Sequence, residues 1–506
     1  MSDRNRMFKE DSEILRGRAR SAVCARLIPA LAAVSLSLLT SQARADALDP
    51  ANPSDRQALS TCHLEGLSRP ARCGTFHVPE NREAPQGRRI AIGVAVVPAS
   101  GSPALADPIV PLMGGPGEDA ISAAGYFADR LSSLLQDRDL LLIDQRGTGR
   151  SGALGCQLYD PENPEATLRD FFPPKAVEKC ARELEARADL TRYTYLDLAH
   201  DIEHVRRALG YGELNLFAAS YGTRAAQVFV RAYPRSVRTV FLGSVVPIDV
   251  PVPPTFARTT EDVLERTFVA CGDDAACRGA FPNLRDEFHQ ILARLDSGSV
   301  RVALPGRAEP VRLYRDRVTE WFRSLLYRPS DAAVLPWTIH RAYEGDWRAI
   351  AEGILSGSRA RDSAISSGLF FSITCSEDVP FMSEEDIARA TRDTVLGDYR
   401  PRQQIAACCY WPKAELARDY RSPIRTNIPT MFVSGDTDAG SPLWFTQHVA
   451  PGFSNRIEII MRGRGHTEWD DCVGRLYERF VRNGDTKGLD AQSCKATPRP
   501  PFKTKP

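Results

Sequence analysis

The segment LNLFAASYGT at residues 214–223 predicts a buried strand that runs into a serine and turns at once into a helix. Leu214 to Phe217 is a short apolar run of the kind found in parallel strands. Ala218 and Gly222 lie two residues before and two after Ser220. Small side chains are needed at both places because the backbone folds back tightly there. The pattern therefore indicates a strand-to-helix turn that presents a serine hydroxyl.

Strands and helices alternate on both sides of this turn. The stretch from Leu196 to Leu209 has apolar residues at helical spacing and stops at Gly210. Short apolar runs bounded by turn residues predict buried strands, after an antiparallel start to the sheet. The alternation predicts an α/β fold with a mostly parallel, doubly wound sheet. The further predicted strands are Gly74–Val78, Arg89–Val97, Ile109–Leu112, Leu140–Ile143, Val237–Leu242, Thr430–Val433 and Ile457–Met461.

A long polar and mostly helical segment interrupts this alternation at residues 251–421, and we expect it to form a lid over the sheet. The core would then consist of residues 46–250 and 422–495. The tail at 496–506 alternates proline and lysine, which predicts disorder. The helices predicted within the lid are Glu261–Ala270, Leu284–Leu295, Val318–Tyr327 and Glu384–Thr394.

Residues 1–45 have the pattern of a secretory signal. Basic residues precede an apolar run from Leu27 to Leu39, and Ala43-Arg44-Ala45 follows as a cleavage site. Pro29 interrupts the run, which is shorter than the ~20 apolar residues a membrane span needs. No later stretch is apolar enough either, so we expect no stable membrane insertion. The sequence predicts cleavage near Ala45 and a periplasmic or secreted protein.

The charge balance argues against a nucleic-acid partner. The chain has 65 basic and 64 acidic residues, a formal net charge of +1, so it has no overall field that would attract a polyanion. A small substrate fits this balance better.

The 12 cysteines are many for a reducing compartment. One of them, Cys24, lies in the signal segment, and we expect one of the others, Cys408 or Cys409, to be a free thiol. No C-x-x-C pair is present and the histidines are scattered, so we predict no metal site and no cofactor. Local spacing pairs Cys62 with Cys73, Cys156 with Cys180, Cys271 with Cys277, Cys472 with Cys494, and Cys375 with Cys408 or Cys409.

A serine hydroxyl is a weak nucleophile at neutral pH and needs a base that a carboxylate holds in place. Two later predicted strands run directly into such groups: one leads to Asp436 and Asp438, and the next leads to His466. Carboxyl ends of parallel strands meet at one edge of a sheet, where open α/β sheets place their sites. We therefore predict Ser220 as nucleophile, Asp438 as the acid and His466 as the base.

Other residues compete for these roles. Asp436 lies nearer its strand, but a residue there is well placed to bind the loop backbone. His448 follows no strand. His200 and His204 are four apart on a helix, but Asp201 stands where a zinc-binding helix would have glutamate, which favours a solvated helix face.

Acyl transfer also requires backbone N–H groups aimed at the developing oxyanion. The amide of Tyr221 is one expected donor. Gly114-Gly115-Pro116-Gly117 follows a predicted strand, and its glycines allow close approach of the backbone. We predict Gly115 as the second donor.

Four motifs stand out in this chain: Gly-Gly-Pro-Gly at 114–117, Asp-Gln-Arg-Gly-Thr-Gly-Arg-Ser at 144–151, Ser-Tyr-Gly-Thr at 220–223 and Gly-Asp-Thr-Asp at 435–438. Taken together, they resemble the prolyl and tripeptidyl aminopeptidase branch of the α/β-hydrolases. The resemblance covers nearly all of the mature chain and implies hydrolysis near a free peptide amino terminus. Met113, Ala218 and the segment 439–442 depart from the family pattern without removing a catalytic group.

An aminopeptidase must recognise a cationic amino terminus. In the resembled family an acidic group of the lid commonly does this, and Glu377 and Asp378 are the candidates here, beside a predicted disulfide at Cys375. The alternative for both acids is helix capping or a solvated loop. The leading hypothesis is thus an exported serine aminopeptidase with a small peptide substrate. A carboxylesterase or lipase acting on uncharged esters, or an inactive binding protein of the same fold, are the alternatives.

Overall fold

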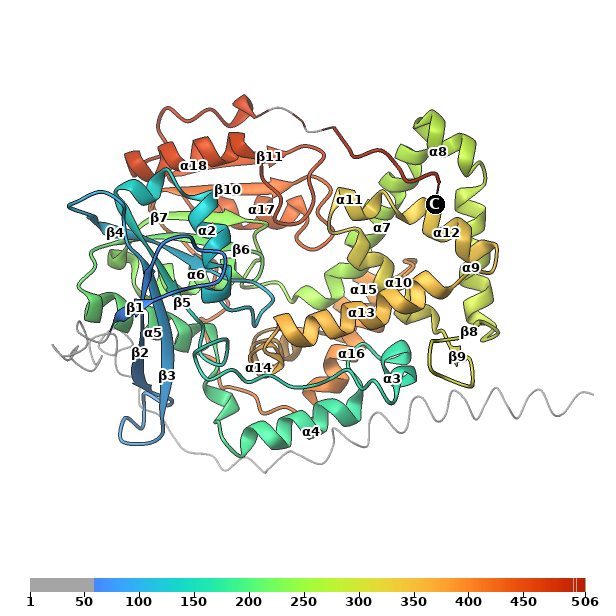
Figure 1. Ribbon diagram of the computed structural model, residues 1–506, viewed down its shortest axis with the longest axis horizontal. Coiled ribbons are helices and arrows are strands. Elements are labelled where there is room, and N and C mark those ends of the chain that lie inside the picture. Colours follow the sequence, from blue (N-terminus) through green and yellow to red (C-terminus); the bar gives the residue numbers. More distant parts are fainter. Residues whose placement is uncertain (1–58, 495, 497, 506) are drawn as a thin grey trace, which may run out of the picture.

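The computed structural model describes residues 59–494, 496 and 498–505, and the predicted signal segment lies outside them. Its centre is a nine-stranded sheet in the order β1-β2-β3-β5-β4-β6-β7-β10-β11 (Figure 1). The strands are β1 (Ser60–Cys62), β2 (Ala71–Pro79), β3 (Arg89–Val97), β4 (Leu105–Leu112), β5 (Arg138–Ile143), β6 (Leu214–Ala219), β7 (Val237–Gly243), β10 (Thr430–Gly435) and β11 (Arg456–Met461).

Most of this sheet is parallel. Neighbouring strands run parallel from β5 through β4, β6, β7 and β10 to β11. The strands β1, β2 and β3 pair antiparallel with one another, and β3 pairs antiparallel with β5. The predicted α/β class, including the antiparallel start, is therefore confirmed.

Helices cover both faces of the sheet, because successive strand side chains point to opposite sides. In β3, Val94 and Val96 belong to the apolar cluster shared with α5 and α6. Ala95 and Val97 belong to the cluster shared with α2 and α18. The bounds of these helices are α5 (Tyr195–Leu209), α6 (Gly222–Ala232), α2 (Ala124–Arg130) and α18 (Asp471–Asn483).

Helix α5 shows how the local sequence sets the element bounds. The Thr194 side chain accepts from the Asp197 N–H, and the Asp197 side chain accepts from the Thr194 N–H, which together form a capping box. At the other end Gly210 has φ 72°, a left-handed conformation that ends the helix. The predicted helix at 196–209 is thus confirmed to within one residue.

A helical region lies between β7 and β10 and occupies the right of Figure 1, beside the sheet. It has its own apolar cluster, with Phe268, Phe288, Phe322 and Ile350 among its members. Leu168, from a helix that precedes α5, joins the same cluster, so an earlier segment also contributes. That residues 251–421 form a distinct lid stays a prediction. The helices are α7 (Val252–Asp273), α8 (Ala275–Ala280), α9 (Leu284–Asp296), α10 (Arg315–Leu325), α11 (Pro329–Ala332), α12 (Leu335–Tyr343), α13 (Arg348–Ala364), α14 (Ser367–Glu377), α15 (Glu384–Thr391) and α16 (Tyr399–Cys408), with α3 (Pro164–Arg169) and α4 (Pro174–Glu185) before them in the chain.

The carboxyl-terminal tail differs from the prediction of disorder. Phe502 is buried in the cluster of the helical region, and the Lys503 N–H donates to the Ala333 carbonyl over 3.0 Å. In Figure 1 the tail runs across to the neighbourhood of α12. The tail is polar in composition, but burial of the Phe502 side chain favours an ordered position for it.

Five disulfides join the cysteine pairs that the spacing predicts, and Cys375 pairs with Cys408. The structure shows no free thiol among the described residues, because Cys409, which is in none of these five pairs, is also disulfide-bonded. A free thiol in the mature chain stays a prediction. Within residues 59–505 as the structure describes them, none of the helices has both the length and the apolar composition for crossing a membrane.

Candidate active site

Ser220 lies in the turn between β6 and α6. Its φ is 54°, an unusual value for a residue with a side chain, and the turn is held because the Ser220 N–H donates to the Gly243 carbonyl. A Cβ on Gly222 would lie 2.1 Å from the Leu112 carbonyl oxygen, so no other residue fits there. The strained turn projects the hydroxyl at the carboxyl end of the strand, as the sequence predicts.

His466 and Asp438 complete a chain of hydrogen bonds with this serine. His466 Nε2 lies 2.9 Å from Ser220 Oγ. Its Nδ1 lies 2.9 Å and 3.0 Å from the two carboxylate oxygens of Asp438. A carboxylate can only accept, so the ring carries its proton on Nδ1 and leaves Nε2 as an acceptor for the serine hydroxyl.

The two neighbouring acids at the end of β10 have different partners. Asp438 is buried, and its Oδ1 also accepts from the N–H groups of Gly440 and Ser441. Asp436 accepts from the Gly463 N–H over 2.7 Å. The structure thus joins Asp438 to the histidine, while Asp436 binds the backbone of the loop that carries His466.

The glycine-rich loop after β4 reaches Ser220 from the other side. Gly115 and Tyr221 both line the cavity at the serine, where the sequence places the oxyanion donors. Gly115 has φ 103°, a value open to glycine, which lets the loop backbone turn toward the nucleophile.

The Asp-Gln-Arg-Gly motif after β5 supports this loop. The Asp144 carboxylate accepts from the N–H groups of Ala120 and Ile121. The Gln145 side chain donates to the Met113 carbonyl over 3.0 Å. These contacts hold the residues on either side of the Gly-Gly-Pro-Gly loop, so the second motif supports the first.

A cavity of about 80 Å³ lies over the serine. One side, which we name the sheet wall, consists of residues at strand ends, and the other, the helical wall, comes from α7, the region of α10, α14 and α16. The sheet wall comprises Gly115, Ser220, Tyr221, Val246, Gly440, Ser441 and His466; the helical wall comprises Val252, Pro253, Phe256, Arg323, Tyr327, Phe370, Thr374, Arg400 and Gln404.

Glu377 and Asp378 are not among the residues that line this cavity. The Asp378 carboxylate pairs with Arg224 at 3.0 Å and accepts from the Tyr221 hydroxyl at 3.2 Å. Glu377 accepts from the Tyr195 N–H, and burial raises its pKa to about 7. Because α14 is helical through both Phe370 and Glu377, the acids lie beyond the part of the helix that reaches the cavity. The structure therefore places them behind Tyr221 and out of the cavity.

An acid that the sequence prediction missed lies in the glycine-rich loop itself. The Glu118 carboxylate accepts from the Gly114 N–H, and the charge of His466 acts on it. Burial raises the pKa of Glu118, while these two interactions act in the opposite direction. Glu118 directly follows the Gly-Gly-Pro-Gly motif, so its place in the sequence was an available signal.

Tyr327, at the end of α10, is a second missed residue. Its carbonyl accepts from the His466 N–H over 2.7 Å, and its ring lies 5.0 Å from the imidazole. The helical region therefore also fixes the histidine loop. No local sequence pattern marks a tyrosine for this contact, which joins residues far apart in the chain.

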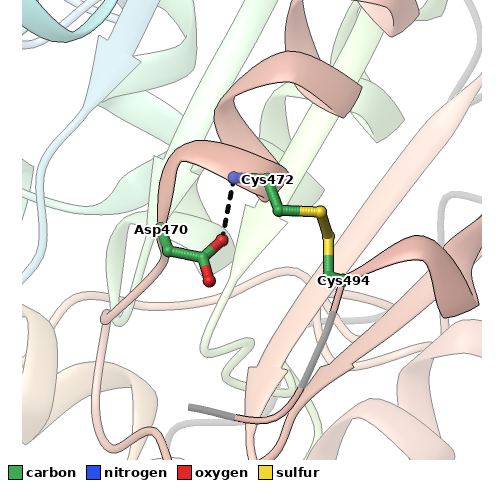
Figure 2. A group of neighbouring side chains, drawn as sticks. All are labelled: Asp470, Cys472 and Cys494. Carbon is green, nitrogen blue, oxygen red and sulfur yellow. Dashed lines mark hydrogen bonds between the residues drawn. A yellow bond between two sulfur atoms is a disulfide. The ribbon is translucent and has the colours of Figure 1, made fainter.

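The remaining histidine and cysteine candidates have other partners. His448 contacts Asp249, and His200 contacts the Tyr233 hydroxyl at 2.5 Å. Burial lowers the pKa of His200 to about 4, and Asp201 is fully buried against Arg146, so the expected solvated face is wrong. Figure 2 shows Asp470, Cys472 and Cys494 close together, but both sulfurs form a disulfide and Asp470 caps α18. Disulfide sulfurs are not thiolate ligands, so this group does not offer a metal site.

Comparisons with known proteins identify the fold family and relatives of this chain. The family model described as the alpha/beta hydrolase fold matches residues 107–466. The serine protease Hip1 of Mycobacterium tuberculosis is 24% identical over 456 residues, which cover 82% of this chain and 86% of that protein. The tripeptidyl aminopeptidase of Streptomyces lividans is 22% identical over 485 residues, 86% of each chain. A proline iminopeptidase structure from Mycobacterium smegmatis covers 81% of this chain and 99% of its own, with a TM-score of 0.38 and 13% identity. The two sequence relatives confirm the resemblance drawn from the motifs.

Proposed function

Because this chain belongs to the α/β-hydrolase fold family, we propose that it is an exported serine aminopeptidase that releases residues or short peptides from free amino termini. The observation that carries the proposal is the unbroken hydrogen-bond chain from Ser220 Oγ through His466 to Asp438. A serine hydroxyl with an oriented imidazole beside it is equipped for acyl transfer.

In the proposed reaction, His466 Nε2 takes the proton of Ser220 as Oγ attacks the substrate carbonyl carbon. The carbonyl oxygen becomes an oxyanion between the N–H groups of Gly115 and Tyr221. The protonated imidazole, stabilised by Asp438, gives its proton to the departing amine. A water molecule then attacks the Ser220 ester with His466 again as base, which releases the acyl product and restores the serine.

The choice of amide substrates is supported by the relatives, two of which are named as a serine protease and a tripeptidyl aminopeptidase. Names alone do not assign a substrate, so the preference for free amino termini needs a group in this chain that would bind an ammonium.

Glu118 is the acid that we assign to this ammonium. Its carboxylate lies on the loop that supplies Gly115 and is within electrostatic reach of His466. Glu377 and Asp378, the acids that the sequence favours, do not bind the ammonium in this proposal, but Asp378 supports the site indirectly. Asp378 holds the side chain of Tyr221, whose backbone N–H is a proposed oxyanion donor.

Export is part of the same proposal. Five disulfides among the described residues support an oxidising compartment. Mature protein should begin at Asp46, which intact-mass measurement of the protein recovered outside the cytoplasm would test.

One substrate panel tests the enzymatic proposal. It contains free tripeptidyl amides, their N-acetylated forms and neutral p-nitrophenyl acyl esters of matched size. The proposal expects the free amides to have the highest kcat/KM and acetylation to lower it by about 10-fold or more. Equal cleavage of free and acetylated peptides, with faster turnover of neutral esters, would instead make the protein a carboxylesterase.

A further inference from the structure

The helical wall of the cavity carries two arginines around a single carboxylate. Arg323 Nε and Nη2 donate to Glu320 Oε1, and Arg400 Nη1 donates to the same oxygen over 2.9 Å. Both arginines line the cavity, whereas Glu320 does not. The wall therefore brings two arginines to the cavity, which share one negative charge between them.

Arg400 has donor capacity that the protein does not use. Its side chain is 9% exposed, and its Nε is buried without a hydrogen-bond partner. All three nitrogens of the Arg323 guanidinium have partners, since its Nη1 donates to the Tyr327 hydroxyl. A buried, unpaired guanidinium donor is costly, and because Arg400 also lines the cavity, an acceptor bound there would gain a bond that no protein group takes.

More positive charge lies behind this wall. The guanidinium groups of Arg317, Arg361 and Arg400 lie 5.0, 4.4 and 4.1 Å from the centre of the Phe171 ring. Burial and, after it, the charge of Arg317 together lower the pKa of Arg361 to about 10. Asp362, beside Arg361, and Glu320 offset part of this charge, but the arginines outnumber them, so the helical wall has an excess of positive charge.

The other groups around the cavity do not cancel this excess. The Asp378 carboxylate is paired with Arg224. Thr374 donates its proton to the Phe370 carbonyl, so its oxygen must accept from the Gln404 amide, and the Gln404 carbonyl is left without a partner. Glu118, on the glycine-rich loop, is not among the residues that line the cavity; burial raises its pKa, and the charge of His466 acts against this rise.

From this arrangement we propose that the helical wall is a specificity site for a carboxylate, so that the enzyme prefers substrates with an acidic side chain beside the bond that it cuts. The inference rests on the proposed hydrolase function and names its substrate class. Arg400 donates its unused N–H to the carboxylate, and Arg323 holds Arg400 in place through Glu320. The same carboxylate can come from the residue on the acyl side or on the leaving side of the scissile bond.

Matched acid and amide substrates test this at pH 7.5. The acyl arm compares Ala-Ala-Glu with Ala-Ala-Gln aminomethylcoumarin amides. The leaving arm compares Ala-Ala-Ala-Glu with Ala-Ala-Ala-Gln, with products read by mass spectrometry. A third pair, the p-nitrophenyl monoesters of glutarate and glutaramate, reads the charge preference without any peptide, so failure of the aminopeptidase proposal and failure of this one are separate outcomes.

The expected result is a kcat/KM about 10-fold to 100-fold higher for the acid than for its amide, in the ester pair and in one of the peptide arms, which identifies the side. Arg400→Met should bring the ratio to within about 3-fold of one. Arg402→Met is the matched control, because Arg402 lies on the same helix but pairs with exposed Glu384 and Asp398, and it should leave the ratio unchanged.

Each ratio is measured on one preparation and does not depend on the fraction of folded enzyme. If Arg400→Met does not fold, as judged by circular dichroism, the wild-type ratios of acid to amide cleavage still test whether the enzyme prefers a carboxylate. Equal or faster cleavage of the amides in all three pairs would overturn the proposal. So would a ratio that survives in Arg400→Met.

Discussion

The two walls of the cavity differ in how far the protein satisfies its own polar groups. On the sheet wall, Ser220, His466 and Asp438 bond to one another, and the acid takes two further backbone N–H groups. The Ser441 hydroxyl, also on the sheet wall, has no partner but lies outside this network. On the helical wall, the groups without a partner are a charged donor, Arg400 Nε, and the Gln404 carbonyl. A closed network keeps its geometry whichever substrate binds, whereas unpaired groups gain partners only from a substrate that fits them. The difference assigns the chemistry to the sheet wall and the selection of substrates to the helical wall.

The strongest way to break this assignment is Ser220→Ala. We expect turnover of every substrate in the panel to fall by about 10⁴-fold or more, because the nucleophile is lost. Folding should persist, since the change removes one hydroxyl. Steady-state assays, with a thermal melt to show that the variant is folded, measure both. Turnover within about 10-fold of wild type would refute the nucleophile.

The two acids at the end of β10 provide a matched pair. Asp438→Asn should lower kcat by about 10³-fold to 10⁴-fold, because an amide no longer holds Nδ1 of His466 as the donor. Asp436→Asn, two residues away, should lower kcat by less than about 10-fold, because its carboxylate contacts the Gly463 N–H and an amide oxygen can accept the same bond. Measuring kcat of both variants at saturating substrate shows which substitution costs more activity. The opposite order would move the acid to Asp436.

The pH dependence of folding stability tests whether Glu377 is buried away from the cavity. Burial raises its pKa from 4.5 to about 7, so between these values the unfolded chain releases a proton that the folded protein keeps. This group therefore makes folding less favourable as pH rises from 4.5 to about 7. Glu377→Gln keeps the bond from Tyr195 but cannot titrate, so its stability relative to wild type should rise by about 3 kcal/mol across that window and then level off.

Urea unfolding of both proteins at pH 5 and pH 7.5 measures this difference. If the free energy of unfolding changed equally between pH 5 and pH 7.5 in wild type and in Glu377→Gln, Glu377 would be ionised in the folded state throughout this range.

The smallest expected effect is on recognition of the substrate ammonium, and it distinguishes Glu118 from Glu377 as the acid that binds it. Glu118→Gln should lower kcat/KM by about 10-fold for free peptides and hardly at all for acetylated ones, because one ionic contact is lost. Glu377→Gln should leave the ratio of free to acetylated cleavage unchanged, since Glu377 bonds to the Tyr195 N–H behind Tyr221, whereas Glu118 lies on the loop that carries Gly115. The panel of free and acetylated amides measures both variants. A larger change in the ratio for Glu377→Gln would return the ammonium site to the position first favoured by the sequence.

The sheet wall could be predicted from the sequence and the helical wall could not. Strand periodicity places the carboxyl ends of β6, β10 and β11 at one edge, so Ser220, Asp438 and His466 follow from short local patterns. Arg323 and Arg400 come from α10 and α16, and their sequences look like ordinary charged helix faces among 65 basic residues. Only the packing of these helices makes them buried neighbours. Glu377 was misplaced for a related reason, because helix α14 carries Phe370 and Thr374 to the cavity and takes the following acids past it.

The most direct test of the central claim is covalent labelling of the folded protein with a fluorophosphonate, followed by peptide mapping. The account predicts one adduct, on Ser220, formed by the folded enzyme and absent after unfolding in urea, because only the folded chain brings His466 Nε2 to within 2.9 Å of the hydroxyl. An adduct on a different serine, or no adduct from a preparation that hydrolyses the panel, would contradict it.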